Sequence, residues 1–292
     1  MRVLLLGASG FIGRSIVAKT PEKIELTGTY YRNKLEFNQI KVEQFNYLDS
    51  EINWQQIVAK YDCIIVAARA NAGTETTRNR VSEKAQLAFS ELTQAVSKSK
   101  SKPFIVAVNG SLSYGHRGEE LVKTSDNINP TGFASSYAIA EKPFRDFLRT
   151  GNAIAIIRAP WVIGSGSWFS LMYLNANRIP IINHGTQWMA LVSVDDLADY
   201  VWQVVESSKS GILHPQLTYR CRQKDFAEIV QKVTSKRTQH IGRIKRMWME
   251  KQMRESVLAS IKLDDGMGDQ SENQAAERRL ITIVENIYSG FS

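Results

Sequence analysis

Residues 1–13, MRVLLLGASGFIG, decide the fold class. A short apolar run over residues 2–6 stops at Gly7, and Gly10 and Gly13 follow at intervals of three. Glycines in this position allow a tight turn and the close approach of a pyrophosphate, which the free N–H groups at the start of the next helix receive. The stretch therefore predicts a buried strand, a nucleotide-binding turn and a helix.

Further along the chain, short apolar runs alternate with amphipathic stretches. Strands are expected over residues 2–6, 25–31, 41–46, 63–68, 104–108 and 153–158, and helices over 11–19, 51–60, 79–99 and 135–149. This alternation is typical of an α/β, doubly wound parallel sheet with helices on both faces. We place a nucleotide-binding domain over residues 1–160, with a return at about 186–206, and a smaller, mainly substrate-binding domain over 161–292.

The composition indicates a folded chain with a core of its own. Of the 292 residues, 43% are hydrophobic and 23% are charged, which excludes a disordered or fibrous protein. Since no stretch of 20 or more residues lacks charge, we expect a cytoplasmic protein without a membrane partner. Cys63 and Cys221 are expected to be free thiols, and four scattered histidines predict no metal site.

The positive charge is concentrated late in the sequence. The whole chain carries +8, and residues 220–255, with eleven Lys or Arg against four Asp or Glu, account for +7 of it. Such a segment favours an anionic partner: a phosphorylated or nucleotide-bearing substrate, an acidic carrier protein or nucleic acid. Nucleic acid is the least favoured, because no aromatic residues interleave with the basic ones and no known module accompanies them. A solvated basic face is the alternative.

Several motifs in order along the chain resemble one protein family. They are GASGFIG (7–13), YDCIIVAA (61–68), NGSLSYG (109–115), Tyr137 near a lysine, IRAPWVIG (157–164) and VSVDDLA (192–198). With these motifs in this order, the chain resembles the extended or atypical short-chain dehydrogenase/reductases, the NAD(P)-dependent epimerase/dehydratase group. The resemblance implies a Rossmann-type sheet with a small C-terminal substrate domain, a nicotinamide cofactor and a homodimer, which is frequent in the family.

The residues after the second strand favour NADP(H) over NAD(H). Folds that bind NAD place a carboxylate there for the ribose 2′-hydroxyl, whereas this chain offers Arg32 and Lys34, with Arg14 as a further cation for a 2′-phosphate. The turn itself contributes Gly7, Ser9, Gly10, Phe11, Ile12 and Gly13. By the family pattern, the rest of the cofactor is expected to contact Asn46 and Tyr47 at the adenine, Ala67, Ala68 and Arg69 at the ribose and nicotinamide, and Pro160 at the nicotinamide.

The family's catalytic pattern is present with departures. A lysine four residues after the catalytic tyrosine lowers the pKa of the phenol from about 10 toward neutrality. Here Glu141 stands four residues after Tyr137, and Lys142 stands five after it. Either a kink or π-bulge near Pro143 returns Lys142 to the tyrosine, or Glu141 replaces the lysine and disables ordinary ketone reduction.

Other candidates concern the substrate. The family's serine falls on Gly110, so the adjacent Ser111 is the candidate for holding the substrate oxygen, and Tyr114, Trp161, Trp168 and Arg243 are expected to contact the substrate. The prediction is an NADP(H)-dependent oxidoreductase that reduces a carbonyl on a small anionic or carrier-bound substrate. The alternatives are a nucleotide-sugar epimerase or reductase, and a catalytically impaired NADP(H)-binding sensor or scaffold protein.

Overall fold

The chain folds into two compact units. The computed structural model describes residues 1–33, 37, 40–69, 72–266 and 274–290. Unit 1 comprises Met1–Asn109, Ser136–Arg158 and Ala198–Leu213, and unit 2 comprises Gly110–Ser135, Ala159–Leu197 and His214–Ser292. Both units are therefore built from segments that are far apart in the sequence.

Unit 1 contains a seven-stranded sheet in the order β11-β7-β5-β4-β1-β2-β3. Its strands are β1 (Arg2–Leu6), β2 (Glu25–Tyr30), β3 (Lys41–Gln44), β4 (Cys63–Val66), β5 (Phe104–Gly110), β7 (Ile154–Ala159) and β11 (Gly211–Leu213). The strands pair in parallel, β1 with both β2 and β4. Because the strand order reverses at β1, the carboxyl ends of these strands form the crevice where doubly wound folds bind ligands.

All six strands expected from the sequence are present, and the predicted fold class is confirmed. The second, third and fourth strands end one or two residues earlier than expected, and the fifth continues to Gly110. The seventh strand, β11, was not predicted, because three residues are too few to show a hydrophobic periodicity.

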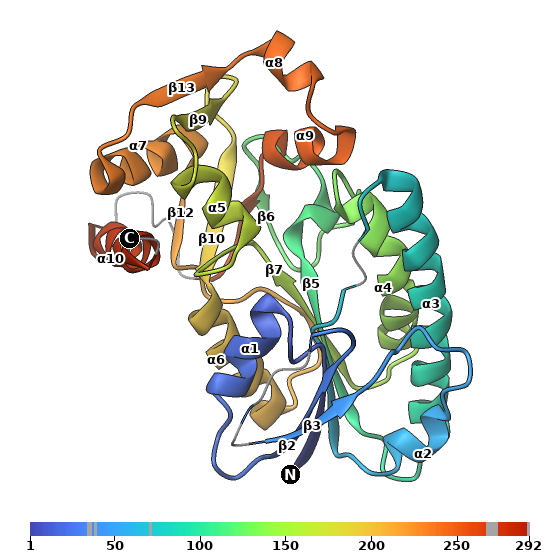
Figure 1. Cartoon of the computed structure of the whole chain (residues 1–292). Coiled ribbons are helices and arrows are strands. Elements are labelled where there is room, and N and C mark those ends of the chain that lie inside the picture. Colours follow the sequence, from blue (N-terminus) through green and yellow to red (C-terminus); the bar gives the residue numbers. More distant parts are fainter. Residues whose placement is uncertain (34–36, 38–39, 70–71, 267–273, 291–292) are drawn as a thin grey trace. The chain divides into compact units, whose positions relative to one another are not determined.

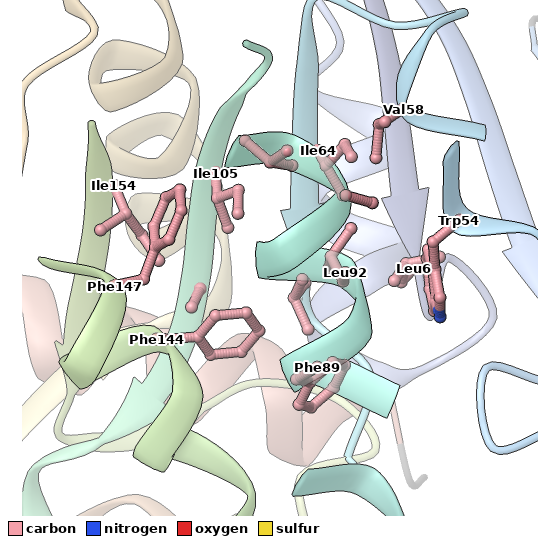
Figure 2. Packing of buried hydrophobic residues seen from close by; sticks show 14 of the residues in the cluster. Leu6, Trp54, Val58, Ile64, Phe89, Leu92, Ile105, Phe144, Phe147 and Ile154 are labelled. Atoms are coloured by element: carbon pink, nitrogen blue, oxygen red, sulfur yellow. The ribbon is translucent and has the colours of Figure 1, made fainter. Parts of the chain in front are cut away.

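Helices cover both faces of this sheet (Figure 1). They are α1 (Phe11–Ala18), α2 (Trp54–Val58), α3 (Glu75–Lys98), and the parts of α4 (Ala134–Arg149) and α6 (Val194–Ser207) that belong to unit 1. On the α3 and α4 side, every second strand residue enters the core, as with Ile64 and Val66. Phe89 and Leu92 of α3 and Phe144 of α4 belong to the same cluster (Figure 2).

The described part of unit 2 contains three small sheets. The first joins β8 (Trp161–Ile163), β10 (Trp188–Ser193) and β12 (Tyr219–Arg222); the second, β9 (Ile179–Ile182) and β13 (Thr238–Ile241); the third, β6 (Leu121–Val122) and β14 (Lys262–Leu263). The helices are the 3₁₀ helix η1 (Ser111–Tyr114), α5 (Trp168–Leu174), α7 (Gln223–Thr234), α8 (Arg243–Met247), α9 (Lys251–Leu258) and α10 (Gln274–Ser289). No helix of the described residues is long and apolar enough to cross a membrane.

The limits of the two units differ from the ranges expected for the domains. Residues 110–135 group with unit 2 although they lie inside the expected first domain, and the later return to unit 1 covers Ala198–Leu213. The return begins later than expected because β10, at Trp188–Ser193, pairs with β8 and β12 of unit 2.

Candidate functional site

The turn after β1 is shaped by two glycines. Gly7 has a φ of 92°, and a Cβ there would lie 2.8 Å from the backbone of Ala68. A Cβ on Gly13 would lie 2.0 Å from the carbonyl oxygen of Gly7. Gly7 thus permits the turn, and Gly13 lets α1 approach the strand closely.

Thr29 at the end of β2 holds this turn in place. Its Oγ1 accepts a hydrogen bond from the Gly7 N–H at 3.1 Å and donates one to the Leu5 carbonyl at 3.2 Å. Helix α1 then begins with Gly10 as its N-cap, with no side-chain cap bond and no acidic residue in the first turn. The free N–H groups and the positive end of the helix dipole are therefore available to an anion.

A cleft of about 650 Å³ opens at this turn, over the carboxyl ends of β1, β2 and β4. Nine of the residues predicted to bind the cofactor line it: Gly7, Ser9, Gly10, Arg32, Asn46, Tyr47, Ala67, Ala68 and Arg69. Sequence segments that are about 60 residues apart are brought to one cavity because parallel strands end at the same edge of the sheet.

The cleft is positively charged. Arg32, Arg69 and Lys84 line it, and none of its described lining residues is Asp or Glu. The guanidinium of Arg32 lies over the ring of Tyr31, with Cζ 5.2 Å from the ring centre. This cleft therefore favours an anionic ligand that also carries a flat, apolar part.

Of the six remaining predicted cofactor residues, five are described by the structure and do not line the cleft. Phe11, Ile12 and Gly13 lie in the first turn of α1, where backbone N–H groups rather than side chains would meet an anion. Arg14 donates from Nε to the Ser9 carbonyl at 3.1 Å, so it braces the turn. Pro160 belongs to unit 2. The sixth, Lys34, lies outside the described residues.

Sequence reasoning missed several lining residues of the cleft. Thr29 and Tyr31 lie at the end of β2, and Lys84 comes from the middle of α3. Thr29 could have been found as a polar residue at a strand end beside the glycine turn. For Lys84 the sequence gives no signal, because an exposed lysine on an amphipathic helix is ordinary.

A second cavity, of about 50 Å³, shares Tyr47, Ala68 and Arg69 with the cleft and is also lined by Tyr137 and Glu141. Burial raises the pKa of Tyr137 to about 12; Arg69 opposes this rise and Glu141 adds to it. The Arg69 Cζ lies 5.1 Å from the centre of the tyrosine ring. Tyr137 therefore keeps its proton at neutral pH.

Glu141 occupies the position of the family's lysine, one helical turn after Tyr137. It is almost completely buried and forms a bidentate ion pair with the fully buried Arg158, with Nη2 2.6 Å from Oε1. Asn109 donates to the same carboxylate from the end of β5, and Arg145 lies 3.1 Å from it. The carboxylate is thus held between α4, β5 and β7.

The expectation that a bulge returns Lys142 to Tyr137 is wrong. Helix α4 is a continuous α-helix from Ala134 to Arg149 in spite of Pro143. Lys142 is exposed and pairs with Asp146, and it lines neither cavity. Five residues on a regular helix turn by about 140°, which directs the lysine away from the tyrosine face.

A scan against family models matches residues 3–214 to the NAD dependent epimerase/dehydratase family. The chain belongs to this family. No curated protein matches it.

Among solved structures, the human epimerase family protein SDR39U1 with NADPH is 18% identical, covering 98% of this chain and 100% of its own, with a TM-score of 0.74. MoeE5 with UDP-glucose and NAD is 17% identical over 100% of both chains, with a TM-score of 0.75. A UDP-N-acetylglucosamine 4-epimerase from Methanobrevibacter ruminantium is 16% identical, covering 100% of this chain and 99% of its own, with a TM-score of 0.74. At these identities the likeness shows the fold.

The cleft of this epimerase/dehydratase family member fits the nicotinamide dinucleotide that the family uses. Its turn has no room for a Cβ at Gly7 or Gly13, and its α1 N-terminus is open to a pyrophosphate. Tyr47, stacked on Phe89 with ring centres 5.3 Å apart, offers an apolar wall. Family and geometry together support a nicotinamide cofactor.

The candidate serine, Ser111, and the expected substrate residues lie in unit 2 and are buried to different degrees. Ser111 is buried at the start of η1. Tyr114 is completely buried, and its hydroxyl bonds to Nε2 of His214 at 2.7 Å, so it has no surface for a substrate, contrary to expectation. Trp161 packs on Phe169 with ring centres 4.5 Å apart, and Trp168 is partly exposed at the edge of this aromatic cluster. Arg243 is exposed on α8.

Proposed function

We propose that the cleft binds NADP(H) in preference to NAD(H). The observation that carries the proposal is the set of cations, Arg32, Arg69 and Lys84, in a lining whose described residues include no carboxylate. A carboxylate at the end of β2 would accept a bond from a ribose 2′-hydroxyl and repel a 2′-phosphate, whereas Arg32 can hold that phosphate through two parallel N–H bonds.

We infer that the reaction is reduction of a carbonyl on a small anionic or carrier-bound substrate, at a rate lowered by Glu141, which stands in place of the lysine that would make Tyr137 a stronger acid. A bound NADPH supplies a hydride to the carbonyl carbon. Tyr137 donates its Oη proton to the carbonyl oxygen, and the resulting tyrosinate regains a proton from water. Because burial raises the pKa of Tyr137 to about 12, the phenol is protonated at neutral pH and has a proton to give, but it is a weaker acid than a tyrosine of ordinary pKa.

The test is NADPH consumption by the purified protein with a panel of ketones, aldehydes and carrier-bound ketones. Tyr137→Phe should lower kcat by about 10²-fold or more while leaving the NADPH dissociation constant unchanged. The rate should show no tyrosine titration between about pH 6 and 9, because the tyrosine stays protonated in that range. Equal turnover by the variant and the parent protein would exclude Tyr137 as the acid.

A second candidate function is NADP(H) binding without turnover, as in a sensor or scaffold protein. The observation that favours it is Glu141, which is locked to Arg158 where the family's lysine would stand. Under this function NADPH binds, no substrate of the panel accelerates its oxidation, and Tyr137→Phe changes nothing.

A nucleotide sugar is the alternative substrate class. Solved structures of similar fold carry UDP-glucose or UDP-glucuronic acid together with NAD. Epimerisation begins with removal of a hydroxyl proton, which the raised pKa of Tyr137 disfavours. Reduction of a keto sugar attached to a nucleotide remains compatible with the site, and product analysis after incubation with UDP-sugars separates the two reactions.

A further inference from the structure

The basic segment 220–255 is partly used for contacts within unit 2. Arg220 is buried and donates to the Leu263 carbonyl at 2.9 Å, and Arg222 pairs with Glu119 and lies over the ring of Trp188. Lys236 donates to the Leu174 carbonyl at 2.5 Å. These cations stabilise the unit itself, so the segment's charge is not all directed to an anionic partner.

Helix α8 in the same segment carries an exposed apolar face. Trp248 is 89% exposed, Ile244 77% and Met247 69%, the three highest values among the large hydrophobic residues that the structure describes. They stand at positions i, i+3 and i+4, which lie on one side of a helix. Within unit 2, α8 lies at the turn of the chain between β13 and α9 (Figure 1).

Exposed cations accompany this face. Arg243 and Lys245 alternate with the apolar residues and are themselves exposed. Arg246 reaches back and donates from Nη2 to Oδ1 of Asn183 at 3.3 Å, so it anchors the helix to the loop after β9. The apolar face, defined here as Ile244, Met247 and Trp248, is therefore presented on a fixed support with positive charge beside it.

We propose that this apolar face and its two exposed cations dock the protein on the surface of an anionic phospholipid bilayer. Tryptophan and aliphatic side chains beside Lys or Arg suit the boundary between headgroups and acyl chains. Each cation near such a surface adds electrostatic attraction. The proposal departs from the expectation of no membrane partner, and it needs no spanning helix.

A bilayer fits these observations better than a protein partner does. A stable protein interface needs about 800 Å² on each side and a complementary shape, which a five-residue helix with two exposed apolar side chains and a third at its C-cap does not provide. A fluid lipid surface requires no complementary shape, and it accepts a few inserted side chains with reversible binding. This inference is independent of the function proposed for the cleft.

The test is co-sedimentation with vesicles of phosphatidylcholine, either alone or with about 30 mol% phosphatidylglycerol. We expect binding to the anionic vesicles only, weakened at high salt. Two variants should each lower the bound-to-free ratio about tenfold or more: Ile244→Ser with Met247→Ser and Trp248→Ser, and Arg243→Glu with Lys245→Glu. Unfolding midpoints establish that both variants fold.

Matched controls make the result specific. Lys98→Glu with Lys100→Glu removes the same charge from another exposed site, and Leu87→Ser removes a residue that is 68% exposed. Both controls should bind vesicles like the parent. Absence of binding to anionic vesicles at low salt, equal losses in controls and α8 variants, or self-association that depends on the apolar face without lipid binding would each overturn the proposal.

Discussion

At the scale of single residues, Glu141 is the feature that separates this chain from the family's catalytic pattern. The carboxylate lies one turn from Tyr137 and pairs with Arg158 and Arg145, with Asn109 as a third partner. A charge pair in the interior stabilises little by itself, but the loss of one partner leaves the other as an isolated buried charge. Glu141 is therefore important both for stability and for the protonation of the tyrosine.

Replacing Glu141 by Gln tests this role. The variant keeps the shape of the side chain and leaves the Arg158 charge uncompensated, so the free energy of unfolding should fall by about 3–5 kcal/mol. Urea denaturation gives the value.

Asp146→Asn is the matched control, because that carboxylate sits on the same helix and pairs with the exposed Lys142. Its effect should stay below about 1 kcal/mol. Similar losses in both variants would mean that the buried pair has no special role.

The sequence narrowed the catalytic question to two alternatives at Glu141 and Lys142 but could not choose between them. The choice depends on whether α4 bulges at Pro143. Whether it bulges depends on the partners that the neighbouring strands supply for the side chains of α4. Arg158, 17 positions later, provides a buried cation that draws Glu141 inward. Local spacing contains no information about such a contact.

At the scale of elements, β1, the glycine turn and α1 form the part of the fold that the sequence predicts best. The strand and the helix both follow from the residues of this stretch itself. Each glycine is needed because a Cβ in its place would come too close to atoms of the same 13 residues or of Ala68. The small sheets of unit 2 could not be predicted in this way, because their strands are two to six residues long and pair across large sequence distances.

Gly13→Ala tests the close packing of α1 on the turn. The new Cβ would lie 2.0 Å from the Gly7 carbonyl oxygen, so the helix must shift and the free energy of unfolding should fall by about 1–3 kcal/mol. NADPH binding should weaken as the pyrophosphate loses its N–H donors. Thermal unfolding and calorimetric titration measure the two effects.

Gly73→Ala serves as the control, since a Cβ there meets nothing within 4 Å. It should alter both quantities little. If Gly13→Ala behaved in the same way, the turn would have to be looser than the structure indicates.

At the scale of the whole molecule, the cleft belongs to one unit. The described residues that line it all lie in unit 1, from Gly7 after β1 to Lys84 on α3. Family membership and this cleft support a nicotinamide cofactor. The charge of the lining leads to the central claim, which is that the cofactor is NADP(H).

Calorimetric titration with NADPH and with NADH, on the parent protein and on Arg32→Ala, tests that claim most directly. We predict that the parent binds NADPH at least about tenfold more tightly than NADH, because a charge-assisted contact to the 2′-phosphate contributes roughly 1.5–3 kcal/mol. Arg32→Ala should remove most of this difference and leave NADH binding nearly unchanged. Equal or tighter binding of NADH by the parent protein, or binding of neither dinucleotide, would contradict the account.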